Sequence, residues 1–273
     1  MSRTPCQRPR LSSLGLTALR DYLSDRDIAI VRSVYTCRLM STKHIERLHF
    51  LPYNRTAYTA ARICRRVLQR LTDEQVLRRR ERRIGGVRAG SASYVYALGP
   101  VGARLVSDKR LHYYTSDPSD YFFEHTLALA ELYVQLYEQA RAKRFSLLEV
   151  QCEPPCWRTF TTLEAGRQVL KPDMFVRLAQ GNDEISYFME MDRGTTYAPA
   201  LLKKLKTYEQ YFASGKEQKQ HGVFPQVLWI APDNKRKAML EKITADINNR
   251  IPGICAVTTT ADILAFLGQQ LPP

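Results

Sequence analysis

The sequence has no apolar stretch that approaches the ~20 continuous residues a transmembrane helix needs. Residues 1–20 are rich in arginine but have no sustained apolar segment and no cleavage site, so they do not resemble a secretory signal. The six cysteines are scattered. Cys152 and Cys156 are close together, but no second pair and no neighbouring histidine completes a zinc set. These absences predict a cytoplasmic protein with reduced thiols and no structural zinc.

Glycine-rich phosphate loops and other cofactor motifs are also missing, so no bound cofactor is expected. The composition is otherwise ordinary for a globular protein, with 44% apolar and 25% charged residues. A chain of 273 residues is long enough for one large domain or two modest ones, each with its own core.

Acidic residues are scarce in the first part of the chain. Residues 1–120 contain 23 Lys and Arg against 10 Asp and Glu, a net charge of +13, whereas residues 121–273 carry 18 against 17, a net of +1. This asymmetry predicts that a nucleic-acid interface lies in the N-terminal part.

An amphipathic helix is predicted within residues 55–71, where apolar residues recur at three- and four-residue steps. Its charged positions are all cationic, and the next acid is Asp73. A solvated helix normally mixes charges of both signs, so this pattern indicates an anionic partner. The residues of this helix predicted to contact DNA are Arg55, Thr56, Tyr58, Thr59, Arg62, Arg65, Arg66 and Arg70.

A basic β-hairpin is predicted directly after this helix. Its two β-capable runs, 76–84 and 93–98, flank a tip that contains glycine and arginine. A basic helix followed by such a hairpin is typical of a winged helix-turn-helix, in which the helix enters the major groove and the wing contacts flanking phosphates or the minor groove. The wing residues predicted to contact DNA are Arg78, Arg79, Arg80, Arg82, Arg83 and Arg88; a surface hairpin with solvated arginines is the alternative.

The predicted domain organisation follows from these motifs. Residues 1–22 form a basic arm, residues 23–112 the winged helix-turn-helix, residues 113–120 a linker and residues 121–273 a second domain. Within residues 23–112, a Ser-x-x-Asp start at Ser24 opens one helix, and Thr42 is expected to cap a short second one. The second domain is predicted as helix, three strands, helix, strand, helix, strand, helix, which implies an α/β sandwich with a central mixed sheet.

Acidic residues mark two strands of the second domain. Pro172-Asp173 opens one strand, and Glu190 and Asp192, on the same face of the chain by strand alternation, end the next. If the strands are neighbours, Asp173 and Glu190 converge at one sheet edge. They would then suit Mg²⁺ or Mn²⁺, and such a metal could activate water against a phosphodiester. Lys204, on the following helix, could face the same site.

These motifs carry two resemblances. The element order, with Pro-Asp on one strand and Glu-x-Asp on the next, resembles the PD-(D/E)xK nuclease fold. Across residues 23–231 the chain resembles the replication-relaxation family of plasmid and mobile-element proteins, in which a winged helix precedes a nuclease-like domain. The matching pieces are residues 23–28, 94–100, 124–125, 171–173 and 188–195, Lys203-Lys204-Leu205 and Tyr208.

One departure matters for activity. The nuclease pattern places a lysine two residues after the second acid, where this chain has Asp192. If the domain is active, Lys204 could replace that lysine and Glu124 could add an acid, beside Asp173, Glu190 and Asp192. Alternatively, Asp192 pairs with Arg193 in a domain that has lost catalysis, and we expect the non-catalytic form.

Three functions therefore remain open. The first is a double-stranded DNA-binding accessory factor in plasmid replication control or mobilisation. Its second domain would then recruit a relaxase, a replication initiator or another mobile-element protein, and a homodimer would fit winged-helix habits. The second is a Mg²⁺- or Mn²⁺-dependent endonuclease or nickase, targeted by the winged helix, and the third is a transcriptional regulator. No membrane partner is expected.

Overall fold

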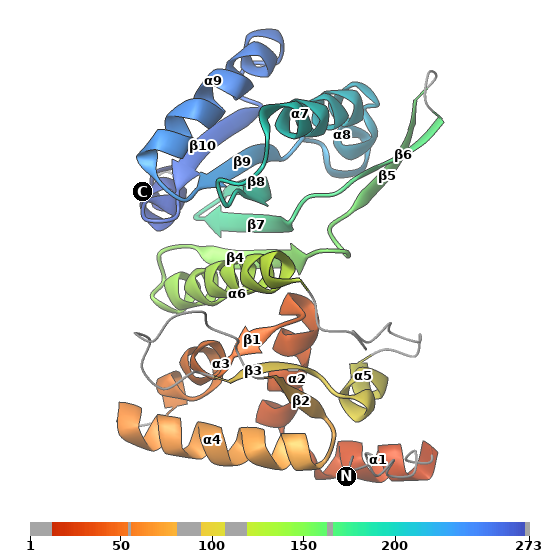
Figure 1. The fold of residues 1–273 in the computed structure, drawn as a ribbon, viewed down its shortest axis with the longest axis vertical. Helices are drawn as coiled ribbons and strands as arrows, with labels where there is room; N and C mark the ends of the chain where they lie inside the picture. Colours follow the sequence, from red (N-terminus) through yellow and green to blue (C-terminus); the bar gives the residue numbers. More distant parts are fainter. Residues whose placement is uncertain (1–12, 54–55, 81–93, 107–118, 163–165, 271–273) are drawn as a thin grey trace, which may run out of the picture. The chain divides into compact units, whose positions relative to one another are not determined.

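A computed structural model describes residues 13–53, 56–80, 94–106, 119–162 and 166–270 (Figure 1). The chain divides into two compact units, Met1–Phe123 (unit 1) and Glu124–Pro273 (unit 2). The predicted linker, residues 113–120, lies outside the described residues except for its last two, and Asp120 already starts a helix. The described residues form a mixed α and β protein whose central five-stranded sheet is mixed, which confirms the predicted fold class at this level.

Unit 1 combines helices with a short antiparallel sheet. Its elements are α1 (Ser13–Tyr22), α2 (Asp25–Cys37), β1 (Met40–Ser41), α3 (Thr42–His49), the 3₁₀ helix η1 (Leu51–Tyr53), α4 (Ala57–Asp73), β2 (Leu77–Arg80), β3 (Val95–Leu98) and α5 (Pro100–Val106). The strand order is β1-β3-β2, and both pairings are antiparallel. The end of the predicted basic arm is therefore helical in α1, and the tip of the predicted hairpin lies outside the described residues.

Side-chain caps set where three of these helices begin. The Ser24 hydroxyl accepts from the Asp27 N–H at 3.3 Å, and the Asp27 carboxylate accepts from the Ser24 N–H at 3.0 Å, which is the predicted capping box. The cap of α3 is Ser41 and not Thr42, because the Ser41 hydroxyl accepts from the His44 N–H at 3.1 Å. Thr56 caps α4 through the Thr59 N–H at 3.2 Å.

Two glycines fix the turn between β3 and α5 against the end of α4. A Cβ at Gly99 would lie 2.1 Å from the carbonyl oxygen of Gln75, and one at Gly102 would lie 2.1 Å from that of Val76. The Gly99 N–H donates to the Val76 carbonyl at 2.9 Å. Only glycine allows the two backbones to approach this closely, so the base of the β2–β3 hairpin is packed directly on α5.

Unit 2 is built around the sheet of order β10-β9-β8-β7-β4. Its elements are α6 (Asp120–Arg141, which begins just before the unit boundary), β4 (Ser146–Cys152), β5 (Arg158–Thr162), β6 (Gly166–Leu170), β7 (Met174–Gln180), β8 (Asp183–Met191), α7 (Ala198–Ala213), α8 (Lys216–His221), β9 (Gln226–Ala231), α9 (Asn234–Arg250), β10 (Cys255–Thr259) and α10 (Ile263–Gln270). β4, β7 and β8 pair antiparallel, and β8, β9 and β10 pair parallel.

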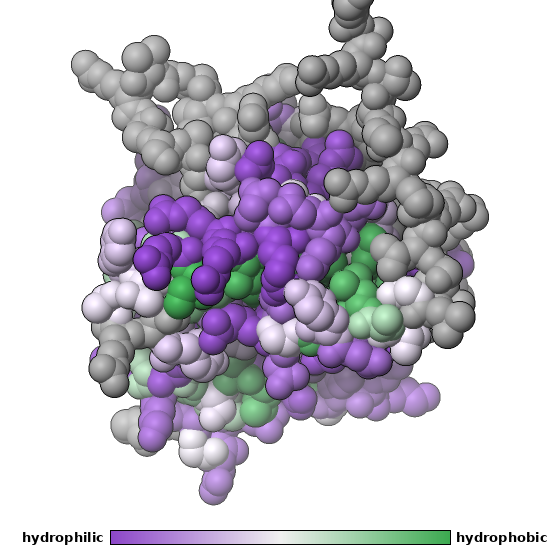
Figure 2. All heavy atoms as spheres, turned by 90° about the horizontal axis from the view of Figure 1, so that it is seen from below, coloured by the Kyte–Doolittle hydropathy of each residue, from purple (hydrophilic) through white to green (hydrophobic). Residues whose placement is uncertain are grey.

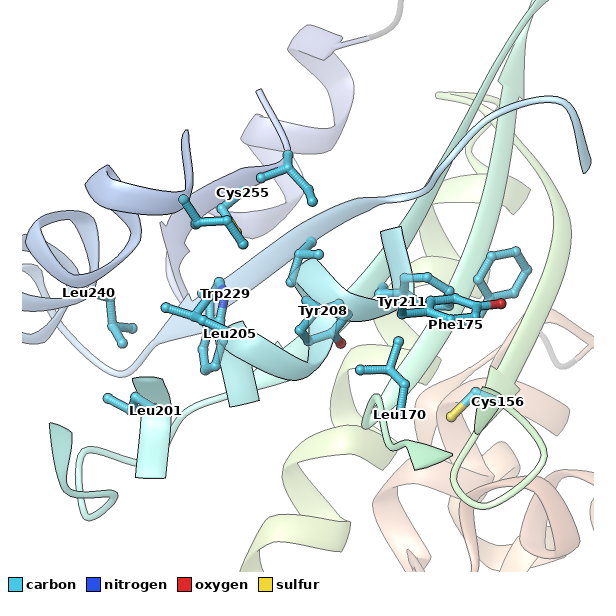
Figure 3. Close-up of a cluster of buried hydrophobic side chains, with 14 of the residues drawn as sticks. Cys156, Leu170, Phe175, Leu201, Leu205, Tyr208, Tyr211, Trp229, Leu240 and Cys255 are labelled. Atoms are coloured by element: carbon cyan, nitrogen blue, oxygen red, sulfur yellow. The ribbon is translucent and has the colours of Figure 1, made fainter. Parts of the chain in front are cut away.

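Both faces of this sheet contain buried apolar residues. On one face, Phe175, Phe188 and Trp229 pack against α7 and α9 in a cluster that includes Leu205 and Tyr208 of α7 (Figure 3). The opposite face buries the residues between them in sequence, which are Met174, Val176, Tyr187, Met189, Leu228 and Ile230. Burial on both faces explains why β9 is apolar from Val227 to Ala231 and β8 from Tyr187 to Met189.

The predicted order of unit 2 lacked two elements. The hairpin β5–β6 was not predicted, although it contributes Phe160 and Leu170 to the core cluster, and neither was α8. The hairpin strands contain many polar and charged residues, so their apolar pattern is weak. α7 and β9 follow β8 as the helix and the strand that the predicted order places after the three strands.

One ion pair joins the start of α2 to the last turn of α4. Arg70 Nη2 donates to both carboxylate oxygens of Asp27 at 2.7 Å, and the Asp27 side chain is only 3% exposed. Asp27 therefore serves the cap of α2 and the packing of α4 at the same time.

We predict that Arg70→Ala destabilises unit 1 by about 2 kcal/mol, because it leaves the buried Asp27 carboxylate without its cation. Arg66→Ala is the matched control, since Arg66 is exposed on the same helix without such a partner and should change stability by less than about 0.5 kcal/mol. Hydrogen exchange of peptides from α2 and α4 in the full chain measures both variants. Equal protection in the two variants would contradict the assigned role of the Asp27–Arg70 pair.

Candidate functional site

The outer side of α4 is an exposed basic stripe. Opposite the buried residues Ala60, Cys64, Leu68 and Leu71, the helix exposes Tyr58, Arg62, Arg65, Arg66 and Gln69. The Tyr58 ring is 75% exposed. Figure 2 looks onto the side of unit 1 on which α4 lies in Figure 1, and hydrophilic residues make up most of its described surface.

Four exposed arginines of this region are not paired with any acid that the structure describes. Within the described parts of the chain, Arg62, Arg65, Arg66 and Arg78 of β2 form no ion pair and no side-chain hydrogen bond. A cation that is exposed and unpaired keeps its full capacity to bind an anion. These four residues define what we call the basic face of unit 1.

Other predicted contact residues are occupied within the protein. Arg70 binds Asp27, as described above, and lies 3.5 Å from Glu74. The Arg79 guanidinium lies 4.3 Å from the centre of the Tyr94 ring, and its Nη1 is 3.5 Å from Gln69 Oε1. Gln69 in turn donates to Asp73 at 2.9 Å. The polar side chains from Gln69 to the end of α4 are thus bound within the protein, whereas the arginines before Gln69 are available to a ligand.

The remaining residues predicted to contact DNA either take part in the protein's own structure or lie outside the described residues. The Thr56 hydroxyl donates to the Thr59 hydroxyl at 2.9 Å, so both residues take part in the start of the helix. Arg80 is half-buried. Arg55, Arg82, Arg83 and Arg88 lie outside the described residues.

In unit 2 the structure brings Asp173, Glu190 and Lys204 together. Asp173 directly precedes β7, and the register of β7 and β8 places it opposite Glu190. Lys204 of α7 bonds to Glu190 Oε2, and its Nζ lies 3.8 Å from Asp173 Oδ1. The Tyr208 hydroxyl, one helical turn further along α7, donates to Glu190 Oε1 at 2.5 Å. We refer to these four residues as the carboxylate–lysine cluster.

The electrostatics of the cluster follow from its burial. Glu190 is 1% exposed, and burial raises the pKa of its carboxyl to about 8, an effect that Lys204 only partly offsets. Burial alone would raise the pKa of Asp173, but Lys204 and His125 lower it. A single ammonium group faces two buried carboxyl groups, and the pKa of Glu190 is raised while that of Asp173 is lowered.

Asp192 belongs to a different contact. Its carboxylate accepts from Arg236 Nε at 2.5 Å and from Nη2 at 3.0 Å, and the Asp192 side chain is 1% exposed. Arg236 Nη2 also donates to the Thr196 carbonyl at 2.7 Å. Arg236 and not Arg193 is therefore the partner of Asp192, and this bidentate pair fixes the loop between β8 and α7.

The cluster does not fit a divalent cation in this arrangement. The carboxylate oxygens of Glu190 are taken by Lys204 and Tyr208, and Asp173 Oδ2 accepts from the Met191 N–H at 2.8 Å. Among the residues that the structure describes, no three His, Cys, Asp or Glu side chains are arranged to hold a metal. His125 Nε2 lies 3.6 Å from Asp173 Oδ1, and the preceding residue, Glu124, is half-buried on the same helix.

Several functional neighbours were not predicted from the sequence. His125 and Tyr208 lie in motifs that matched the family, but no pattern in the sequence gave them a contact. Arg236 lies 44 residues after Asp192, so no local spacing connects the two. A further buried acid, Glu217, accepts a hydrogen bond from the Tyr211 hydroxyl and lies 3.4 Å from Arg158 Nε.

The cysteines in the described parts of the chain are free thiols, and all of them are buried. Burial raises the pKa of Cys64 and of Cys255 to about 12, so both thiols stay protonated at neutral pH. Cys156 donates to the Pro172 carbonyl at 3.0 Å.

The fold and these sites define a two-unit protein with an exposed basic helix in one unit and a buried carboxylate–lysine cluster in the other. The chain belongs to the replication-relaxation family, which it matches over residues 31–227. Neither the curated proteins nor the solved structures that were compared gave a match. Of the helices that the structure describes, none has the length and apolar character to cross a membrane.

The raised pKa of Glu190 predicts a pH effect on stability. This pKa is about 8 in the folded chain, whereas the ordinary value of 4.5 applies in the unfolded chain. The folded state therefore binds more protons across this window, and the free energy of unfolding falls as pH rises from about 4.5 to about 8. The side chain in Glu190→Gln cannot ionise, so we expect the free energy of unfolding of this variant not to show this decrease.

The measurement is urea unfolding of both proteins at pH 5.5 and pH 8.5. Trp157 and Trp229 are the two tryptophans of the chain and both lie in unit 2, so their fluorescence reports this unit alone. Between the two pH values the wild type should lose more than about 1.4 kcal/mol relative to Glu190→Gln, the equivalent of one pKa unit. If the difference in unfolding free energy between the wild type and Glu190→Gln is the same at both pH values, Glu190 is ionised in the folded protein.

Proposed function

We propose that unit 1 is a winged helix-turn-helix that binds double-stranded DNA. In this proposal α4 enters the major groove, and β2 and β3 form the base of the wing. The observation that carries it is the basic face: Arg62, Arg65, Arg66 and Arg78 are exposed and have no ion-pair partner in the part of the chain that the structure describes. The order α2, β1, α3, α4, β2, β3 and the strand order β1-β3-β2 also fit this motif.

Charge distribution supports the same proposal. Unit 1 carries +13 of the chain's net charge of +14, and phosphate contacts by lysine and arginine dominate the affinity of DNA-binding proteins. Arg78 of the wing would contact a phosphate and help to position the protein, because contacts to phosphate carry no sequence information.

We further propose that the protein is an accessory factor in replication control or mobilisation of a plasmid or mobile element. Membership of the replication-relaxation family supports this role. Unit 2, a PD-(D/E)xK-like α/β sandwich, would serve in assembly or recruitment, with a relaxase or a replication initiator as the partner. A homodimer that reads two half-sites is compatible with this role.

A non-catalytic unit 2 is favoured by the state of its carboxylates. A phosphodiester would have to reach Glu190, which is covered by α7, and a metal would have to displace Lys204 from both acids. The convergence of Asp173, Glu190 and Lys204 is nevertheless what a metal-dependent nuclease would require, so cleavage is the second candidate function and needs a direct test.

The DNA-binding proposal predicts that Arg62→Gln/Arg65→Gln/Arg66→Gln lowers affinity for random-sequence duplex DNA by at least about tenfold, because three unpaired cations are removed from the groove-facing helix. Arg78→Gln should reduce the slope of log K against log salt by about 1, the effect of one lost phosphate contact. Fluorescence anisotropy at salt concentrations from about 50 to about 200 mM measures both the affinity and the slope.

The matched control is Arg144→Gln/Lys235→Gln/Lys242→Gln, which removes three exposed charges from unit 2. It should leave DNA affinity nearly unchanged. Duplex RNA of the same sequence should compete poorly, because its deep and narrow major groove does not admit a helix. Equal losses in the two triple variants would indicate non-specific attraction and would argue against α4 as the interface.

For the second candidate function, we predict that the full chain neither nicks nor cuts supercoiled plasmid in Mg²⁺ or Mn²⁺, and that DNA affinity is the same in excess chelator. Asp173→Asn/Glu190→Gln should bind DNA as the wild type does, because neither residue belongs to unit 1. If the wild type cleaves with metal and the double variant only binds, unit 2 is a nuclease and the non-catalytic proposal is wrong.

A further inference from the structure

The exposed residues of α4 differ in where they point around the helix axis. At about 100° per residue, Arg62 and Arg66 lie within about 30° of the direction directly opposite the buried residues Ala60, Cys64, Leu68 and Leu71. Arg65 lies about 75° from that direction, on the flank of the helix. If the outer side of α4 faces the floor of a groove, Arg62 and Arg66 point at base edges and Arg65 at a backbone.

The other polar residues of this helix are less suited to select a base. Gln69 is held between Asp73 and Arg79, at 2.9 Å and 3.5 Å. The Tyr58 hydroxyl can either donate or accept a hydrogen bond, so it does not discriminate strongly. The groups best placed to select a base are therefore two guanidinium groups, which are donors only.

A donor-only surface matches one base better than the others. In the major groove guanine presents two adjacent acceptors, N7 and O6, whereas adenine and cytosine each present an amino donor and thymine a single acceptor beside a methyl group. We infer that Arg62 and Arg66 read guanine bases in the major groove and determine the sequence preference of the protein. This inference rests on the proposed DNA-binding function and adds the bases that α4 selects.

The spacing of the two arginines limits the distance between those guanines. Four residues of α-helix rise about 6 Å, which is less than two base-pair steps of about 3.4 Å. The two guanines should therefore be adjacent or separated by one base pair. Arg65, from the flank of the helix, would contact a phosphate and contribute affinity without preference.

The test begins with selection of bound sequences from a random duplex pool by the full chain. Guanines should be enriched at two positions with this spacing. The selected duplex is then made with 7-deazaguanine at each of these positions, which removes the N7 acceptor but keeps base pairing and charge. We expect each replacement to weaken wild-type binding at least about fivefold.

The variants identify the residues. Arg62→Ala and Arg66→Ala should each abolish the sensitivity to 7-deazaguanine at one position, and Arg65→Ala, which removes the same charge from the same helix, should keep both. Three results would overturn the inference while the DNA-binding proposal stands. The selected sequences could lack enriched guanines, 7-deazaguanine could leave wild-type binding unchanged, or Arg62→Ala and Arg66→Ala could keep the wild-type sensitivity to it. If no duplex binds at all, the DNA-binding proposal itself fails.

Discussion

Asp27 is the constraint on which the geometry of unit 1 depends. Its carboxylate closes the capping box of α2 and binds Arg70 in the last turn of α4. Because Arg70 is fixed on one side of α4, the helix cannot rotate about its axis without breaking a bond to a buried acid. Together with the buried residues of α4, this contact keeps Arg62 and Arg66 facing outward.

The sequence alone predicted the elements of unit 1 better than the roles of their side chains. The periodicity of α4 and the capping box at Ser24 depend on residues within a few positions of each other, so both could be read directly. Arg66 and Arg70 look alike in sequence, however, because the partner that distinguishes them lies 43 residues away. The cap at Ser41 was assigned to its neighbour Thr42, an error of one residue between two side chains that both cap well.

In unit 2, too, contacts between neighbouring strands were easier to predict than contacts with side chains from other elements. The sequence predicted that Asp173 and Glu190 would converge if their two strands were neighbours, and the antiparallel pairing of β7 with β8 meets this condition. The partners from other elements were beyond this reasoning: Arg236 for Asp192 and Tyr208 for Glu190 come from α9 and α7. The result is a sheet edge with the acids of a nuclease pattern and an internal ammonium group where such a pattern would leave room for a metal.

The close packing at Gly99 and Gly102 has a consequence for how this protein can vary. A side chain at either position would meet backbone atoms at 2.1 Å, and backbone cannot move aside as a flexible side chain would. The distance between the base of the hairpin and α5 is thus not adjustable in small steps by substitution at these two sites. Variation in how the hairpin meets a binding partner must therefore arise beyond its base, in residues that can change without separating β3 from α5.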